Sequence, residues 1–264
     1  MNSASGDRNF DDLAHRFKRN VYDRLKGDIR LAVLTRDLNE HIPALNMSRD
    51  EGQLDILDAG GGQGQFSLGL AALGHSLHIC DISAKMLALA AEQVAAKSLA
   101  GQVGIVHDSI QNHCQQNPAA YDVVLCHAVL EWVAEPEALI DSLLSALKPG
   151  GYLSLTFYNV NGLIMKNLLR TNFTKVIDED YQGYRGSLTP TWPRNAEDVQ
   201  GWLAKPELAL LCHSGIRCFH DYILDSQQRA ARAEEQLALE LRLSRCEPFR
   251  SLGRYIHLLY RRVL

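Results

Sequence analysis

Apolar residues along the chain alternate between short continuous runs and stripes with helical spacing. An apolar run over residues 54–59 is followed by the glycine-rich residues 60–64 and then by the stripe Phe66, Leu68, Leu70, Ala71 and Leu73. A short apolar run predicts a buried strand, and apolar residues three or four positions apart predict one face of a helix. Gly74 is of a type that commonly ends a helix. Residues 54–74 are therefore expected to form a strand, a turn and a helix.

The same alternation continues through the rest of the chain. Further apolar runs predict strands over residues 75–80, 103–106, 122–126, 152–157, 208–219 and 254–260. Ser83 is placed to cap the helix after the second strand, and Pro136 to open a later one. The sequence Lys148–Gly151 (KPGG) is placed to close that later helix. Between the last two strands, one helix would align Ala230, Ala233, Leu237 and Leu241.

Alternating strands and helices predict an α/β class of fold. We expect a Rossmann-like, seven-stranded and mostly parallel sheet with helices on both faces. Residues 159–206 interrupt the alternation, since they are irregular and rich in Tyr, Trp, Arg and Gly. We expect them to form an inserted cap over the site, which in such sheets lies at the carboxyl ends of the strands.

Composition limits the class of protein. The chain has 264 residues, of which 46% are hydrophobic, and this is enough for one large domain with a full core. Residues 1–10 lack the apolar segment of a secretory signal, and glycines and histidines interrupt residues 59–80, so we expect a cytoplasmic protein without a membrane span. The six cysteines form no Cys-x-x-Cys pair, so we expect reduced thiols and no disulfide framework.

Charge is distributed unevenly along the chain. The formal net charge of −4 gives no general attraction for nucleic acid. However, residues 15–30 contain six Lys and Arg, and residues 241–264 contain six Arg against the single acid Glu247. Each stretch taken alone is typical of a solvated face, but together they could supply phosphate contacts.

The glycine-rich turn after the first strand indicates a nucleotide-type cofactor. Its sequence does not fit the dinucleotide fingerprint G-x-G-x-x-G, because Gln65 occupies the third glycine position. It does fit acid-x-Gly-x-Gly-x-Gly, and so resembles motif I of S-adenosylmethionine-dependent methyltransferases; the matching residues are Asp58, Gly60, Gly62 and Gly64. Asp81 ends the second strand, where a carboxylate can accept both ribose hydroxyls.

A wider resemblance extends over nearly the whole chain. It is carried by "DRNFDDLAHRF", "LDAGGGQGQ", "HAVLEWVAEPEALI", "LKPGGYLSLTFYNVNGL", "LTPTWPRN", "GIRCFHDY" and "LGRYIHL". These segments resemble the tRNA 5-carboxymethoxyuridine methyltransferases, a family of class I S-adenosylmethionine-dependent enzymes. The resemblance implies that residues 1–50 are a helical segment contributing to the cofactor and tRNA sites. It implies a methyltransferase domain over residues 51–264.

The resemblance also implies the cofactor, the substrate and the residues that bind them. The implied cofactor is S-adenosylmethionine, and the implied acceptor is the carboxylate of 5-carboxymethoxyuridine at the wobble position in the anticodon loop of tRNA, which would become a methyl ester. By matching positions, the cofactor contacts fall on Arg30, Gly60, Gly61, Asp81, Ile110, Gln111 and His127. The local departures include residues 184–187 of the cap.

This reaction agrees with what the sequence lacks. There is no Asn-Pro-Pro-Tyr segment for methylating nitrogens, and no cysteine follows Pro or Thr as in the enzymes that methylate pyrimidine carbon. A carboxylate with a pKa near ~4 is already ionised at neutral pH and needs no general base. We therefore expect Arg30 and His127 to position the reactants, with Arg30 paired to the methionyl carboxylate.

Contacts to the RNA are less constrained by the sequence. Trp132 is a candidate for stacking on the uracil. Further candidates for the uridine, its carboxylate or nearby phosphates are Tyr158, Asn159, Arg217, His220 and Arg254. No metal site is expected, because the spacing of Cys212, His213, Cys218 and His220 matches no standard zinc pattern. Two alternatives stay open: a small-molecule carboxyl or O-methyltransferase, and a non-catalytic protein that binds S-adenosylmethionine or RNA.

Overall fold

The computed structural model describes residues 24–46, 52–181 and 189–263. Most of the N-terminal basic stretch, the first part of the segment 1–50 and residues 182–188 of the expected cap lie outside the described residues. Within the described part, no helix is both long and apolar enough to cross a membrane.

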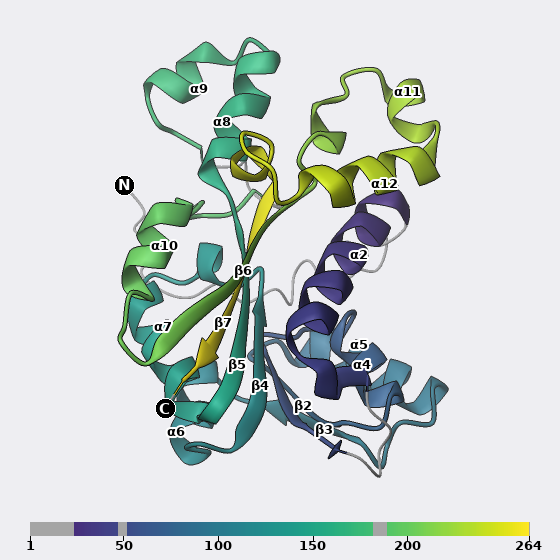
Figure 1. The fold of residues 1–264 in the computed structure, drawn as a ribbon, viewed down its shortest axis with the longest axis vertical. Coiled ribbons are helices and arrows are strands. Elements are labelled where there is room, and N and C mark those ends of the chain that lie inside the picture. Colours follow the sequence, from purple (N-terminus) through teal and green to yellow (C-terminus); the bar gives the residue numbers. More distant parts are fainter. Residues whose placement is uncertain (1–23, 47–51, 182–188, 264) are drawn as a thin grey trace.

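A single seven-stranded sheet forms the centre of the molecule (Figure 1). Its order is β3-β2-β1-β4-β5-β7-β6, and all neighbouring pairs are parallel except those of β7, which is antiparallel to both β5 and β6. The strands are β1 Asp55–Ala59, β2 Ser76–Asp81, β3 Val103–His107, β4 Tyr121–His127, β5 Leu147–Tyr158, β6 Leu208–Ile216 and β7 Tyr255–Arg262. The predicted seven-stranded, mostly parallel sheet is confirmed.

Helices cover both faces of this sheet, as Figure 1 shows. On one face lie α2 (Arg24–His41), α4 (Ser67–Ala72) and α5 (Ala84–Ala96), and on the other α6 (Ile110–Gln116), α7 (Pro136–Ala146) and α10 (Ala196–Trp202). Because successive strand residues point to opposite faces, Ile56 packs in the first layer and Leu57 in the second. Both are fully buried, as expected for strands covered on two sides.

The first described helix, α2, is an integral part of the core. Its residues Ile29, Val33 and Leu34 are fully buried and pack with Ile216 at the end of β6. Leu38 and Ile42 join the layer formed by α4 and α5. The apolar side of α2 therefore places its other residues, among them Arg30, at a fixed position on the sheet.

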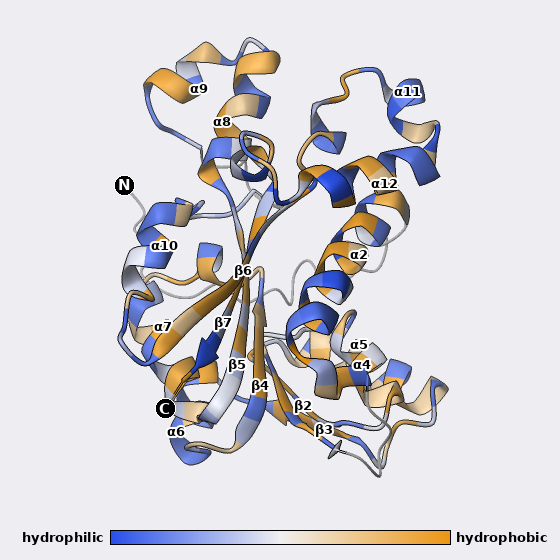
Figure 2. Ribbon diagram, in the orientation of Figure 1, coloured by the Kyte–Doolittle hydropathy of each residue, from blue (hydrophilic) through white to orange (hydrophobic). Residues whose placement is uncertain are grey.

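The inserted segment 159–206 is only partly a cap. Helices α8 (Val160–Leu169) and α9 (Phe173–Ile177) lie beyond the carboxyl ends of the strands (Figure 1). Figure 2 shows that both carry apolar residues, and Phe173 and Ile177 are exposed. In contrast, α10 packs on the sheet, since Val199 and Leu203 are buried in the same cluster as the residues of α7.

The helix opened by Pro136 ends at Ala146, just before Lys148–Gly151 as predicted, and these four residues lie in the first part of β5. The Lys148 ammonium bonds to Asp55 (2.8 Å) and Asp122 (2.9 Å) on strands β1 and β4. Another local prediction, however, was wrong. The helix expected over residues 230–241 is two helices, α11 (Ser226–Ala230) and α12 (Ala233–Leu243). Arg232 separates them with a left-handed backbone (φ 54°), which no Gly or Asn announces in the sequence.

Four short 3-10 helices complete the described structure. They are η1 Pro43–Asn46, η2 Leu130–Trp132, η3 His220–Tyr222 and η4 Arg250–Leu252. η2 follows β4 and η3 follows β6, so both lie at the carboxyl edge of the sheet. All six cysteines are free thiols; five are buried and Cys246 is exposed.

Candidate cofactor site

Two neighbouring cavities lie at the carboxyl ends of β1, β2 and β4. The first is lined by Arg30, Asp58, Gly60, Gly61, Gly62, Gln63, Gln65, Phe66, Asp81, Met86, His127, Glu131, Trp132 and Tyr255, among others. The second is lined by residues that include Gly60, Asp81, Ser109, Ile110, Gln111, Val129 and Trp132. Because Gly60, Asp81, Ala128 and Trp132 line both, the cavities adjoin one another. The predicted cofactor residues other than Gly64 thus meet at this edge.

The glycine turn brings its backbone to the cavity wall. Gly60 and Gly62 have left-handed backbones (φ 71° and 56°), and a Cβ on Gly60 would lie 2.6 Å from a methyl group of Val129. The N–H of Gly60 donates to the carbonyl of Cys80 (2.8 Å), which fastens the turn to β2. Gly64 is different, because a Cβ there would meet Ile79 at 2.8 Å, inside the core. Its glycine is required both by the left-handed backbone (φ 70°) and by packing against the core.

Two carboxylates flank this turn. Asp81 accepts the N–H of Gly62 (2.9 Å) and that of Ser83 (2.8 Å), so its carboxylate is held in one orientation at the end of β2. Asp58 is buried and accepts the hydroxyl of Ser67. Burial raises the pKa of Asp58 to about 6, although Ser67 and Arg30 oppose the shift. The loop therefore places two carboxyl groups beside the cavity.

Arg30 brings a positive charge into the first cavity from α2. Its guanidinium forms no hydrogen bond or ion pair with any residue in the described part of the chain, but its charge acts on Asp58, His127 and Glu131. A cation that lines a cavity without a partner is suited to bind an anionic group such as a carboxylate.

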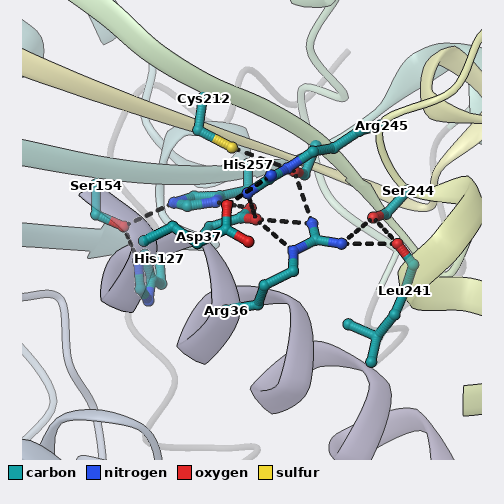
Figure 3. Close-up of polar contacts among 11 residues, drawn as sticks. Arg36, Asp37, His127, Ser154, Cys212, Leu241, Ser244, Arg245 and His257 are labelled. Carbon is teal, nitrogen blue, oxygen red and sulfur yellow. Dashed lines mark hydrogen bonds and ion pairs between the residues drawn. The ribbon is translucent and has the colours of Figure 1, made fainter. Parts of the chain in front are cut away.

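His127 also lines the first cavity and is held from behind by a buried chain of hydrogen bonds (Figure 3). Its Nε2 lies 2.8 Å from Ser154 Oγ, which lies 3.0 Å from Nε2 of His257, and Nδ1 of His257 lies 2.8 Å from Asp37 Oδ2. Arg36 (2.7 Å) and Arg245 (2.6 Å) both pair with the other oxygen of Asp37. This series of hydrogen bonds therefore connects the cavity, through β5 and β7, to α2.

The pleat of the sheet explains this alignment. Residues of β4, β5 and β7 that share the α2 face include His127, Ser154 and His257, because their neighbours Cys126, Leu155 and Leu258 point to the opposite layer. These strands are adjacent in the sheet, so the three side chains form a row. Asp37 on α2 lies at the end of this row, next to His257.

The pKa shifts of Asp37 and His127 indicate the charge at each end of this row. Burial opposes ionisation of Asp37, but the hydrogen bond from His257 and the charge of Arg36 outweigh it and hold the Asp37 pKa well below its usual range. Burial lowers the pKa of His127 well below its usual value, with further contributions from Arg30 and His257. Asp37 is thus a carboxylate and His127 a neutral imidazole.

If His257 is neutral, the direction of these hydrogen bonds also sets where the proton of His127 lies. Asp37 can only accept, so Nδ1 of His257 donates to it. In the neutral form of His257, Ser154 donates to Nε2 of His257 and accepts a proton from Nε2 of His127. This leaves Nδ1 of His127 as an acceptor, and it forms no hydrogen bond with the described residues.

The candidate RNA contacts are distributed over different places. Trp132 lines both cavities. Tyr158, Arg217 and Arg254 lie together beside Tyr255, which lines the first cavity. Asn159 has a structural task instead: it is fully buried, and its amide bonds to the carbonyls of Ser251 (2.9 Å) and Gly253 (2.8 Å) while its oxygen caps α8.

His220 is also separate from the cofactor cavities. Its Nδ1 lies 2.9 Å from Gln236 Oε1, and the residue lines a different cavity between α2, α11 and α12. Its backbone N–H is held by Glu240 at 2.8 Å. Because His220 lines neither cofactor cavity, its position does not support the predicted role in substrate binding.

Several lining residues were not predicted from the sequence. They are Gln63, Phe66, Met86, Val129, Glu131 and Tyr255. Glu131 is the most informative, because it is almost fully buried and its Oε2 has no hydrogen-bond partner. The sequence signal that could have identified Glu131 was its position next to Trp132, just after β4, which ends at the site. Asp37, Ser154 and His257 carried no local signal at all.

One group of potential metal ligands occurs in the described part of the chain: Asp37, Cys212 and His257, with ligand atoms within 4.8 Å of one another. Asp37 is already paired with two arginines and His257. Burial raises the pKa of Cys212 to about 11, so its sulfur is a protonated thiol at neutral pH. Neither condition favours a cation here, and His213, Cys218 and His220 are not part of the group.

The C-terminal basic stretch does not form one surface. Arg245 pairs with Asp37 and Glu40, and Arg254 lies at the carboxyl edge of the sheet. Arg262 bonds to the carbonyl of Leu147 (2.7 Å), at the opposite edge. Because β7 runs antiparallel to β5, arginines at its two ends are placed on opposite sides of the molecule.

Comparisons with known proteins agree with the geometry. Residues 57–155 match the methyltransferase domain family. The chain is 39% identical over 256 residues to the tRNA 5-carboxymethoxyuridine methyltransferase of Escherichia coli (strain K12), with 97% of each chain covered. A shorter match, 31% identical over 106 residues, covers 40% of this chain and 44% of the ubiquinone biosynthesis O-methyltransferase of Vibrio atlanticus.

A solved structure shows that the fold is shared. The magnesium protoporphyrin IX methyltransferase from Synechocystis PCC 6803, determined with bound SAH, matches with a TM-score of 0.61 and 19% sequence identity. The match covers 96% of each chain, so it includes the sheet and the helices on both faces.

Proposed function

The chain belongs to the tRNA 5-carboxymethoxyuridine methyltransferase family, and from this we propose that it methylates the carboxylate of 5-carboxymethoxyuridine at the tRNA wobble position. The enzyme is an S-adenosylmethionine-dependent methyltransferase, and the proposed product is the methyl ester 5-methoxycarbonylmethoxyuridine. The observation that carries the proposal is the 39% identity over 97% of both chains, which extends beyond the common methyltransferase domain into the cap and the last strands.

The two cavities suggest how the cofactor is held. The second cavity, with Ile110 and Gln111, would take the adenine, and Asp81 between the cavities would accept the ribose hydroxyls. Arg30 would pair with the methionyl carboxylate. The guanidinium of Arg30 has no partner in the ranges 24–46, 52–181 and 189–263, and Gly60 and Gly62 allow close approach; both features fit this assignment.

The protein orients the cofactor and the acceptor relative to one another and needs no general base. When bound, the cofactor supplies an electrophilic methyl group on a sulfonium. The acceptor carboxylate has a pKa near ~4 and is ionised at neutral pH, so no proton has to be removed. Neutral His127 carries no charge that would repel the sulfonium. Positioning and exclusion of water are then the main sources of rate enhancement.

The partner in this proposal is the anticodon loop of a tRNA in the cytoplasm. Bases of such loops can be turned out and stacked on aromatic side chains, and Trp132, which lines both cavities, is placed to receive the uracil. Arg217 and Arg254 are the basic candidates that lie nearest to this place.

The test is incubation of the purified protein and S-adenosylmethionine with tRNA that carries 5-carboxymethoxyuridine, followed by nucleoside mass spectrometry. We expect a gain of one methyl group that mild alkaline hydrolysis removes, as for a carboxyl methyl ester. An unchanged nucleoside, with the cofactor bound tightly, would exclude this substrate. A methyl group that survives alkali would place the transfer on another atom.

A further inference from the structure

A cluster of positive charge adjoins the candidate cofactor site. Arg217 follows β6, Arg254 precedes β7, and both face the carboxylate of Asp221 in η3. The distances are long for ion pairs, 3.5 Å from Arg217 Nη2 and 3.6 Å from Arg254 Nε to Asp221 Oδ2. The charges of both arginines and of Asp221 also act on Lys166 of α8. Lys26 of α2 also acts on Asp221, so four cations share this one acid.

Several donors in this cluster have no partner among the residues that the structure describes. Arg254 Nη1 and the hydroxyl of Tyr158 are buried and form no hydrogen bond. Lys166 forms no hydrogen bond or ion pair with the part of the chain that the structure describes. Burial and the charge of Arg254 lower its pKa to about 8. Buried donors and excess charge are costly unless a ligand satisfies them.

The backbone is also strained here. Arg217 has a left-handed conformation (φ 59°), which is unfavourable for a residue with a long side chain. Its carbonyl accepts the N–H of Arg254 (3.2 Å), so the two arginines are fixed relative to one another. Strained residues of this kind cluster at binding and active sites.

Tyr255 connects the cluster with the first cavity. Its ring lines that cavity, and the ring of Tyr158 packs against it edge-on at 5.3 Å between centroids. Arg217 Cζ lies 5.3 Å from the centroid of Tyr255, and Arg254 Cζ lies 4.4 Å from that of Tyr158. Tyr255 does not line the second cavity, so the cluster adjoins the end of the site away from Ile110 and Gln111.

We propose that Lys166, Arg217 and Arg254, with the hydroxyl of Tyr158, form a subsite for an oxyanion of the acceptor RNA. This inference rests on the proposed function, since it takes the RNA as the molecule that enters the first cavity. The oxyanion is either the carboxylate of the modified uridine or a phosphate next to it. Asp221 holds the two arginines in place and leaves net positive charge for the ligand.

The experiment uses two synthetic anticodon stem–loops that differ only at the wobble uridine, one with 5-carboxymethoxyuridine and one with 5-methoxyuridine. Their affinities are measured by fluorescence anisotropy for the wild type, Lys166→Gln and Arg254→Lys. Lys97→Gln is the matched control, because Lys97 is exposed at the C-terminal end of α5, near the opposite edge of the sheet. Cofactor affinity, measured by calorimetry, shows whether each variant is folded.

Loss of one charge-assisted hydrogen bond is expected to weaken RNA binding about tenfold in each cluster variant. A loss confined to the 5-carboxymethoxyuridine RNA identifies the carboxylate as the ligand, and an equal loss on both RNAs identifies a phosphate. The proposal is overturned if folded cluster variants bind both RNAs within about twofold of the wild type, or no more weakly than Lys97→Gln.

The same samples separate this inference from the proposed function. Mass spectrometry of the wild-type reaction tests ester formation without reference to the cluster. If no ester forms while the cluster variants still lose RNA affinity, the proposed reaction fails and the oxyanion subsite stands. If the ester forms and the variants bind RNA normally, the reaction stands and the subsite fails.

Discussion

Glu131 shows how one buried side chain makes stability depend on pH. Burial raises its pKa to about 7, while backbone N–H groups, Arg30 and Arg194 oppose the shift. A carboxyl group whose pKa is higher in the folded state than its model value of 4.5 stabilises the fold when protonated, at low pH. This contribution is lost as the pH rises through about 7. At pH 8 the wild type therefore carries the cost of a buried charge.

Replacing Glu131 with Gln should remove this cost. The amide keeps an oxygen that can accept the same backbone N–H groups but has no charge to desolvate. We expect the stability of Glu131→Gln relative to the wild type to increase by about 3 kcal/mol between pH 5 and pH 8, measured by urea unfolding. Glu137→Gln, at an exposed position of α7, should show no comparable gain. A difference that is the same at both pH values would contradict the buried-charge explanation.

At the scale of elements, the hydrogen-bonded row across β4, β5 and β7 is expected to fix the ring of His127. Ser154→Ala removes its central member and leaves the facing nitrogens of His127 and His257 unpaired. We expect the cofactor to bind about tenfold more weakly by calorimetry, because the proton of His127 is no longer held on Nε2. Nitrogen NMR should show His127 protonated on Nε2 in the wild type and on a mixture of nitrogens in the variant.

The matched control for this change is Ser145→Ala in α7. Within the described part of the chain, its hydroxyl bonds to the carbonyl of Ser142 (2.7 Å) on the same helix, which packs on the opposite face of the sheet from the row. This variant should bind cofactor as the wild type does. A Ser154→Ala protein with wild-type affinity and an unchanged His127 spectrum would show that the row is merely structural.

The same row marks the limit of prediction from the sequence. Strands and their helices were predictable because apolar periodicity is local, and the glycine turn because Gly60 and Gly62 need left-handed backbones. The contact between Asp37 and His257 joins residues separated by 220 positions, so no local pattern announces it. The same holds for Tyr255, whose place in the cavity depends on how β7 enters the sheet.

At the scale of the whole molecule, the position of β7 has a consequence for folding. This strand is formed last along the chain but lies between β5 and β6, with antiparallel pairing on both sides. Its residues Ile256 and Leu258 are fully buried in one layer and Leu259 in the other. Without β7, β6 has no partner and both layers of the core lose residues.

A chain that ends at Gly253 should therefore fail to fold cooperatively, although it keeps all the cofactor-turn residues. We expect circular dichroism to show no sharp thermal transition and calorimetry to show no cofactor binding, since Tyr255 and His257 are also lost. A chain that ends at Arg262 retains the whole of β7 and should behave as the wild type. If the shorter chain melted cooperatively and bound cofactor, strands β1–β5 with their helices would be a self-sufficient unit. The last two strands would then serve only the acceptor side of the site.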